Sequence, residues 1–297
     1  MAYAFVSNFN LNTVSVIDTL TLVNVATIAT PRNPQGIAIH PNGQRVYVGN
    51  YRGNCISVIN VQDFNVIATI AVPENPVGLA ITPNGSHVYV ATQTGGGVTV
   101  IDTALNVVLT SIPTGYNTMD VALHPDGTRA FVCNYDKSTV HVIATVTNTL
   151  SGDAVAVGAR PVSLAVNHAG TKLYVVNQNS GSISVFKTSD MSLDATVRVG
   201  AAPFGIAISS DGSRVYVTNR TDGTVSVIDG VTNAHIGSIR VGGTPTGIDI
   251  DTDGKRLFVA NWASGQMSLV DTDQAIATNG LANMGASYML GRFIGPG

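Results

Sequence analysis

Charged side chains are scarce in this chain, since Asp, Glu, Lys and Arg make up only 11% of its 297 residues, against about a quarter in typical globular proteins. The 15 basic and 18 acidic residues give a net charge of −3, which offers no basic footprint for nucleic acid. No segment rich in Lys and Arg has the pattern of a membrane-surface helix. We therefore expect no nucleic-acid partner and no membrane insertion.

Cysteine, long apolar runs and a leader segment are also missing or nearly so. Cys55 and Cys133 fall at different positions of the repeat described below, so two separate thiols are predicted and no disulfide framework. The longest apolar runs have the length of a strand, too short to span a bilayer. Met1 leads directly into a strand-like run, without the basic and apolar parts of a signal peptide. Two locations stay open: the cytoplasm, and the cell surface or exterior if the chain is one domain of a longer exported protein.

Gly, Ser, Thr, Asn and Val take the place of the missing charge, and they are arranged in a repeat. An apolar stretch that ends in Asn or Thr occurs seven times, and its last residue falls at positions 8, 50, 92, 134, 177, 219 and 261. The spacing is 42 residues, and once 43. One period that runs from end to end predicts a single domain over residues 1–297.

The period from residue 203 to residue 244 shows the local structure. It contains four short apolar or alternating runs, which we interpret as strands A, B, C and D: 203–208, 215–219, 225–229 and 236–241. Asp211-Gly212 supplies the positive φ of a tight turn between A and B. Four antiparallel strands in about 40 residues are typical of a propeller blade. The sequence therefore predicts an all-β, seven-bladed propeller with four antiparallel strands per blade.

The two ends of the chain predict how the ring closes. The chain begins in a strand B, so its first blade has no strand A of its own. After the seventh period, residues 289–294 fall at the strand A position. We expect this C-terminal strand to pair beside residues 3–8, to complete the first blade and to remove the open edges of the ring.

The repeat resembles the YVTN β-propeller family of bacterial and archaeal surface proteins. Tyr216-Val217-Thr218-Asn219 spells the family signature, and the flanking Pro-x-Gly-Ile-Ala-Ile, Asp-Gly and Val-Ser-Val-Ile-Asp elements recur through the whole chain. The resemblance implies a seven-bladed ring that is often one module of a larger cell-surface or secreted protein. The repeats are also similar to those of lactonase-like propellers, but no catalytic set carries over from them. The shared residues build blades, so the resemblance implies no activity.

The B–C and D–A loops are expected on one face of the ring, around the mouth of its channel. The residue after the signature Asn opens each B–C loop, and four of the seven are aromatic: Phe9, Tyr51, Tyr135 and Trp262. Three of these fall on consecutive blades across the ring closure, which predicts an aromatic arc suited to stacking on a sugar ring or a partner protein. The alternative is that each ring only covers its own blade.

The D–A loops predict a second group of candidate residues. In one half of the ring the residues before the Pro position are polar, and in the other half they are small. Asp120 also replaces the Gly of the Pro-x-Gly element. We hypothesise a polar subsite, near Tyr51 and Tyr135, that is built from Arg32, Glu74, Tyr116, Asp120 and Arg160. The alternative is ordinary variation between loops.

Neither a metal nor another cofactor is expected. His40 and His124 lie at A–B turns two blades apart, whereas a metal needs ligands that converge on one point. The sequence contains no phosphate-binding loop, dinucleotide fingerprint or nucleophile elbow in a fitting context.

Three functions stay open. The leading interpretation is a non-enzymatic binding, display or scaffold module of a cell-surface or secreted protein. It would bind a partner protein or glycan at the channel mouth and be a monomer in isolation. The second is a lactonase- or lyase-type enzyme with its site at the same mouth, for which Glu74 and Asp120 are the acidic candidates, without a histidine in the matching loops. The third is a purely structural spacer.

Overall fold

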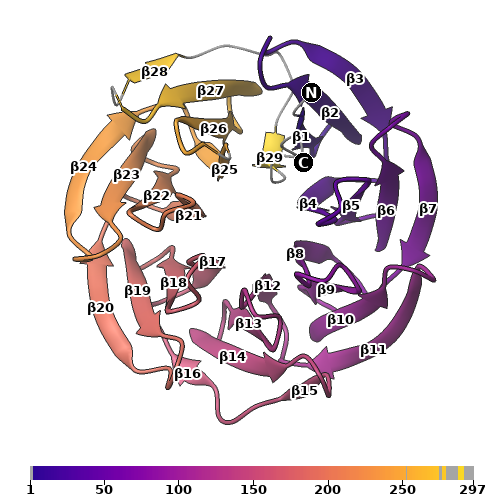
Figure 1. Ribbon diagram of the computed structural model, residues 1–297, viewed down its shortest axis with the longest axis horizontal. Helices are drawn as coiled ribbons and strands as arrows, with labels where there is room; N and C mark the ends of the chain where they lie inside the picture. Colours follow the sequence, from indigo (N-terminus) through magenta and orange to yellow (C-terminus); the bar gives the residue numbers. More distant parts are fainter. Residues whose placement is uncertain (1–2, 252, 274–275, 279–286, 291–297) are drawn as a thin grey trace.

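Seven antiparallel sheets stand in a ring around a central axis (Figure 1). The computed structural model describes residues 3–251, 253–273, 276–278 and 287–290. Six sheets have four strands, and in the fourth blade the outermost strand is split into two short pieces. The described residues contain no helix, so none of them forms one long and apolar enough to cross a membrane. The predicted seven-bladed, all-β propeller is confirmed.

Each blade uses consecutive strands, except the first, which joins the two ends of the chain. Blade 1 consists of β29 (Ser287–Leu290), β1 (Tyr3–Asn8), β2 (Thr13–Asp18) and β3 (Asn24–Ala29). Blade 2 consists of β4 (Pro34–Ile39), β5 (Arg45–Asn50), β6 (Cys55–Asn60) and β7 (Val66–Ala71). Blade 3 consists of β8 (Pro76–Ile81), β9 (His87–Thr92), β10 (Gly97–Asp102) and β11 (Val107–Pro113). Blade 4 consists of β12 (Thr118–Leu123), β13 (Arg129–Asn134), β14 (Thr139–Ala144), β15 (Thr149–Leu150) and β16 (Val155–Ala156).

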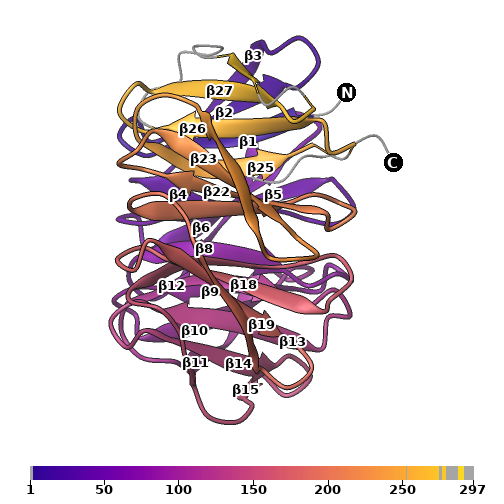
Figure 2. The same ribbon diagram turned by 90° about the vertical axis from the view of Figure 1, so that its left-hand side faces the viewer.

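The remaining blades repeat the plan. Blade 5 consists of β17 (Pro161–Val166), β18 (Lys172–Asn177), β19 (Ser182–Lys187) and β20 (Leu193–Arg198). Blade 6 consists of β21 (Pro203–Ile208), β22 (Arg214–Asn219), β23 (Thr224–Asp229) and β24 (His235–Arg240). Blade 7 consists of β25 (Pro245–Ile250), β26 (Arg256–Asn261), β27 (Gln266–Asp271) and β28 (Ile276–Thr278). The strands cross the thickness of the ring, so the loops at their ends form its two faces (Figure 2).

The ring closes through the C-terminal strand, as predicted. β29 pairs antiparallel with β1, with Leu290 opposite Val6 and Met289 opposite Ser7. The strand starts at Ser287, two residues earlier than predicted, and residues 291–294 of the predicted strand lie outside the described residues. The Arg256 guanidinium also donates a hydrogen bond of 2.8 Å to the carbonyl oxygen of Thr19 in blade 1. The closure therefore has both a strand pair and a side-chain link.

The core lies between the blades. In one buried cluster, Phe5 and Val16 of blade 1 pack with Val46 and Ile59 of blade 2. The aromatic residue of strand B is buried in all seven blades: Phe5, Tyr47, Tyr89, Phe131, Tyr174, Tyr216 and Phe258. Each sheet has two apolar faces that only its neighbours can cover, so the Val-Tyr-Val signature serves packing.

The Gly of the Pro-x-Gly element permits close contact between innermost strands. A Cβ atom on Gly36 would lie 1.8 Å from the carbonyl oxygen of Val77 in the next blade. A Cβ atom on Gly78 would lie 2.1 Å from Oδ1 of Asp120. Both positions therefore need glycine for packing around the axis.

A buried hydrogen bond holds the end of strand B to strand C. The Nδ2 atom of the signature Asn donates to the Oγ atom of a strand C serine in five blades. The pairs are Asn8–Ser15, Asn50–Ser57, Asn177–Ser184, Asn219–Ser226 and Asn261–Ser268, at 2.7–2.9 Å. In these five blades the bond fixes the point at which the B–C loop begins.

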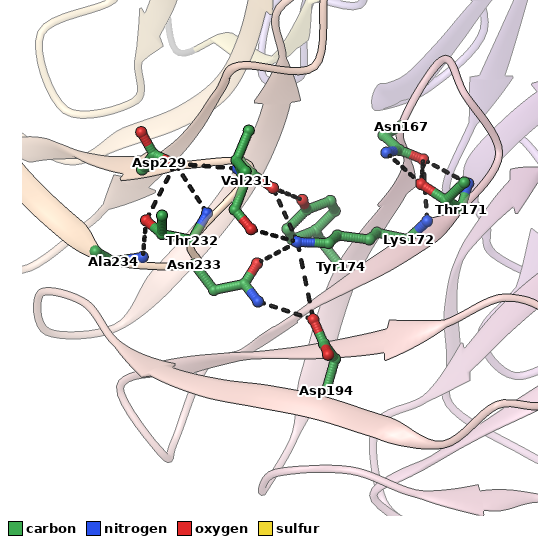
Figure 3. A network of polar contacts seen from close by, with 11 residues as sticks. Asn167, Thr171, Lys172, Tyr174, Asp194, Asp229, Val231, Thr232, Asn233 and Ala234 are labelled. Atoms are coloured by element: carbon green, nitrogen blue, oxygen red, sulfur yellow. Dashed lines mark hydrogen bonds and ion pairs between the residues drawn. The ribbon is translucent and has the colours of Figure 1, made fainter.

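On the opposite face, basic side chains link four of the blades to the blade that follows. The first residue of strand B reaches a carbonyl oxygen in the C–D turn of the following blade: Arg45 to Thr103, Arg129 to Thr188, Lys172 to Gly230 and Arg256 to Thr19. Lys172 makes the most contacts (Figure 3). Its Nζ atom donates to Gly230 O at 2.9 Å, Val231 O at 3.1 Å and Asn233 Oδ1 at 2.9 Å, and it lies 3.8 Å from Asp194 Oδ2.

Candidate functional site

The B–C and D–A loops are joined to each other by backbone hydrogen bonds, and we call the face that they form the mouth face. In six blades the residue before the Pro position accepts from the N–H of the residue after the signature position. The acceptor–donor pairs are Asn33–Tyr51, Asn75–Gln93, Asn117–Tyr135, Arg160–Gln178, Ala202–Arg220 and Thr244–Trp262, at 2.8–3.1 Å. All six acceptors have φ between 51° and 59°. Asn tolerates this left-handed conformation well, which explains its repetition in three of the loops.

Three aromatic rings form a continuous arc on the mouth face. The ring centroids of Trp262 and Phe9 are 5.5 Å apart, and those of Phe9 and Tyr51 are 6.1 Å apart. All three side chains are half-buried. The Tyr51 hydroxyl donates to Oε1 of Gln93 at 2.5 Å, which extends the line of contacts to blade 3. Four adjacent blades thus present one connected row of side chains, which we call the aromatic arc.

A second group of contacts lies on blades 4 and 5. The Tyr135 hydroxyl is 3.4 Å from Oε1 of Gln178, which repeats the Tyr–Gln pair of blades 2 and 3. The Arg160 guanidinium lies over the Tyr135 ring, with its Cζ atom 5.2 Å from the centroid, and it also donates to the hydroxyl at 3.4 Å. In blade 6 the Arg220 guanidinium lies 5.0 Å above the Phe204 ring. These contacts orient two guanidinium groups at the mouth face without pairing them to a carboxylate.

Asp120 lies in the channel wall, between two blades. Its Oδ2 atom accepts hydrogen bonds from the Ser163 hydroxyl at 2.9 Å and from the Leu164 N–H at 3.2 Å, both in β17 of the next blade. The residue is buried. Burial raises the pKa of its carboxyl to about 6, and the hydrogen bonds from Ser163, Leu164 and Val121 limit the rise. Asp120 therefore links β12 and β17, the innermost strands of blades 4 and 5.

The other members of the hypothesised polar subsite are exposed and separate. Arg32, Glu74 and Arg160 lie at the surface, and Tyr116 is 72% exposed. Glu74 accepts a hydrogen bond of 3.3 Å from the Thr94 hydroxyl. Within the described ranges, no hydrogen bond or ion pair joins any two of Arg32, Glu74, Tyr116, Asp120 and Arg160. The structure brings Arg160 to Tyr135 instead.

Two carboxylates of the mouth face were absent from the candidate residues. Asp136 accepts a hydrogen bond from Nδ2 of Asn117, and Asp222 accepts one of 2.7 Å from the Ala201 N–H. Both lie in B–C loops. Asp136 is one residue after Tyr135 and Asp222 is two residues after Arg220, the residues that open these loops. A comparison of whole loops would have found them.

The mouth face has more basic than acidic residues, although the whole chain is acidic. Its B–C and D–A loops contain five basic residues and three acidic ones. The basic residues are Arg32, Arg52, Lys137, Arg160 and Arg220, and the acidic ones are Glu74, Asp136 and Asp222. The A–B and C–D turns of the other face carry most of the Asp residues, where their side chains accept hydrogen bonds from turn N–H groups, as Asp18 does. The charge therefore favours anions at the mouth face.

No metal centre emerges from the part of the chain that the structure describes. No group of three His, Cys, Asp or Glu side chains is placed there to hold an ion. Cys55 and Cys133 are buried free thiols, and burial raises the pKa of both.

Comparisons with known proteins give a partial family match and several structural neighbours. Residues 169–285 match the Cytochrome D1 heme domain family, and no curated protein matches the chain. Hydrazine synthase of Kuenenia stuttgartiensis is 20% identical, with a TM-score of 0.83 over 90% of this chain and 92% of its own. A putative 6-phosphogluconolactonase of Bacteroides fragilis NCTC 9343 is 19% identical, with a TM-score of 0.82 over 99% and 98%. The periplasmic gluconolactonase of Pseudomonas aeruginosa is 17% identical, with a TM-score of 0.82 over 99% of each chain. At these identities the likeness shows the propeller fold.

The described mouth loops of the matched section do not fit a haem group. Haem iron is held by His, Cys, Met or Tyr side chains. The loops at residues 178–181, 199–202, 220–223, 241–244 and 262–265 contain none of these. The one histidine of the section, His235, begins the outermost strand of blade 6, and Tyr174, Tyr216 and Met267 are buried in strands. No described side chain of the mouth loops in this section could therefore hold the iron of a haem group.

Proposed function

We propose that this propeller is a lactonase-type enzyme that takes a small, acidic sugar lactone at its mouth face. Two of the three similar structures named above are described as lactonases, which favours this alternative over the surface binding module. The observation that carries the proposal is the aromatic arc of Trp262, Phe9 and Tyr51, with its rings in contact across the ring closure. We also propose that the chain belongs to the YVTN family, because residues 216–219 spell the signature of that family.

The aromatic arc and the guanidinium groups suit different parts of such a ligand. A sugar ring presents apolar C–H faces that stack on aromatic side chains. A phosphate or carboxylate on the sugar would pair with Arg160 or Arg220, which have no carboxylate partner among the described residues. The excess of basic residues in the mouth loops adds attraction for anions.

Glu74 is our proposed general base. Lactone hydrolysis needs a base that takes a proton from the attacking water and a donor that stabilises charge on the carbonyl oxygen. Asp120 is buried in the wall, and Asp136 and Asp222 accept hydrogen bonds from neighbouring loops. Glu74 is exposed, and within the described residues its carboxylate accepts a hydrogen bond only from the Thr94 hydroxyl. It is therefore the carboxylate of the mouth face that is best able to reach a bound water.

The proposal is tested by hydrolysis and binding of D-glucono-δ-lactone and its 6-phosphate. Trp262 is the single tryptophan, so intrinsic fluorescence reports on the mouth face. We expect a saturable fluorescence change and hydrolysis above the spontaneous rate. Glu74→Gln should abolish hydrolysis but keep binding, whereas Asp136→Asn should leave both near wild type.

The charged group of the lactone is tested separately. Arg220→Ala should weaken binding of the phosphorylated lactone at least tenfold and barely affect the neutral one, and Lys137→Ala serves as the matched control. Binding without hydrolysis would contradict the enzyme and return the chain to the binding modules. The absence of both would contradict any lactone site at this face.

A further inference from the structure

The exceptions to the repeat gather at the mouth loops of blade 3 and at its junction with blade 4. Thr92 replaces the signature Asn in blade 3 only. Thr118 takes the place of the Pro that begins strand A in blades 2, 3, 5, 6 and 7, and residues 95–97 are all glycine. The shared residues of a repeat build its blades, so departures that cluster on one face indicate a functional requirement there.

Gly96 leaves out a side chain that closes the same loop in other blades. In blades 1 and 2 an Asn side chain at this position accepts a hydrogen bond from an N–H group of the D–A loop. The pairs are Asn12–Asn33 at 2.8 Å and Asn54–Asn75 at 3.1 Å. In blade 3 the equivalent N–H, that of Asn117, donates to the carbonyl oxygen of Gln93 at 2.6 Å instead. A Cβ atom on Gly96 would lie 3.8 Å from Cε1 of Tyr116, its nearest described neighbour beyond the adjacent residues. This loop therefore leaves room beside the Tyr116 ring.

Glu74 and Tyr116 are held to this loop by the D–A loops that precede and follow blade 3. The Thr94 hydroxyl donates to the Glu74 carboxylate at 3.3 Å. The Gly115 N–H donates to the carbonyl oxygen of Gly96 at 3.1 Å, which fixes the residue before Tyr116. Tyr116 is 72% exposed, and the described residues offer its hydroxyl no hydrogen bond. One glycine segment thus has a carboxylate and an exposed phenol hydroxyl beside it.

We propose that Tyr116 is the second catalytic residue of the lactone site, and that the lactone carbonyl lies over Gly96, between Tyr116 and Glu74. This inference rests on the proposed function. Glu74 takes a proton from the water that attacks the carbonyl carbon, and the Tyr116 hydroxyl donates to the carbonyl oxygen as negative charge develops there. The bond from the carbonyl carbon to the ring oxygen then breaks. The proton held by Glu74 passes to that oxygen, so water is added across the ester bond.

This position also connects the reacting carbonyl to the aromatic arc. The last contact of the arc is the 2.5 Å hydrogen bond from the Tyr51 hydroxyl to Gln93, and Gln93 opens the loop that contains Gly96. A sugar ring stacked at the Tyr51 end of the arc therefore has its nearest reactive groups on blade 3.

Tyr116→Phe keeps the ring beside Gly96 and removes only the hydroxyl. In steady-state hydrolysis of D-glucono-δ-lactone by the whole chain, kcat should fall about 100-fold. KM should change by less than about tenfold, because a hydrogen bond to the uncharged carbonyl contributes less. Tyr3→Phe is the matched control and should behave like the wild type, since Tyr3 begins β1 at the opposite face and packs on Phe64.

Gly96→Asn tests where the lactone lies. Gly96 has a φ of 77°, and Asn12 and Asn54 have φ values of 55° and 51° at the equivalent position, so the backbone accepts Asn. The new side chain should fill the room beside Tyr116 and raise KM about tenfold or more. Gly181→Asn, at the same position of blade 5 with a φ of 59°, is the matched control and should leave KM unchanged.

The outcomes separate this inference from the proposed function. An active wild type whose kcat survives Tyr116→Phe would overturn the role of Tyr116 and leave the function intact. Equal effects of Gly96→Asn and Gly181→Asn on KM would overturn the position of the lactone on blade 3. A wild type without hydrolysis above the spontaneous rate would overturn the function itself, and this inference with it, before any variant is measured.

Discussion

Asp120 shows how one buried carboxyl makes the stability of the whole ring depend on pH. Its pKa in the folded protein is about 6, whereas an exposed Asp has a pKa near 3.8. The folded state therefore binds the proton more tightly than the unfolded state does. The contribution of Asp120 to the free energy of unfolding is greatest below pH 3.8. It falls as the pH rises through 6, by about 3 kcal/mol in total.

Asp120→Asn tests this dependence. The amide keeps an acceptor for Ser163 and Leu164 but cannot ionise, so the variant should gain stability over the wild type as the pH rises from 4 to 7. Urea unfolding of both proteins at several pH values in this range measures the difference. Asp136→Asn, an exposed carboxylate on the mouth face, is the control and should follow the wild type. A constant difference between Asp120→Asn and the wild type would contradict the raised pKa.

At the scale of the strand, the links between blades are local enough to test one by one. Lys172→Met keeps most of the aliphatic stem of the side chain but removes the ammonium group, so Gly230 O, Val231 O and Asn233 Oδ1 lose their shared donor. We expect the free energy of unfolding to fall by about 2 kcal/mol. Chemical unfolding measures this loss. Lys187→Met removes an exposed ammonium at the end of the adjacent strand and should change stability by less than about 0.5 kcal/mol.

The sequence predicted the strands well, because the repeat averages away local ambiguity. The predicted strands 203–208 and 215–219 are observed as β21 (Pro203–Ile208) and β22 (Arg214–Asn219). The split of the outermost strand in blade 4 was not predicted. It falls where the spacing is 43 residues, and Gly152 there has a φ of 74°. An extra residue with left-handed backbone interrupts pairing to β14, and the periodicity alone cannot locate it.

The candidate site was predictable only as far as register determines it. The spacing of the signature was enough to put Trp262, Phe9 and Tyr51 on neighbouring blades, where the structure has their rings in contact. It could not give the direction of a side chain. Asp120 was expected at the channel mouth but turns toward β17, because Ser163 and the Leu164 N–H provide donors there. Arg160 likewise lies over Tyr135, a preference set by cation–π contact.

At the scale of the whole ring, the pairing of β29 with β1 joins the two ends of the chain. Deleting residues 287–297 should expose the edge of β1 and the inner side of blade 1. We expect the melting temperature to fall sharply, because no other strand can complete this sheet. Thermal unfolding followed by circular dichroism measures the change. An unchanged melting curve would contradict the closure by β29.

The basic links between blades all run in one direction, from strand B of one blade to the C–D turn of the next. During synthesis, blades 3, 5 and 6 therefore each meet a side chain that is already in place on the preceding blade. The fourth link reverses this order, because Arg256 is made long after its acceptor, the carbonyl oxygen of Thr19. Blade 1 must wait, with one side uncovered, until translation has delivered the whole ring.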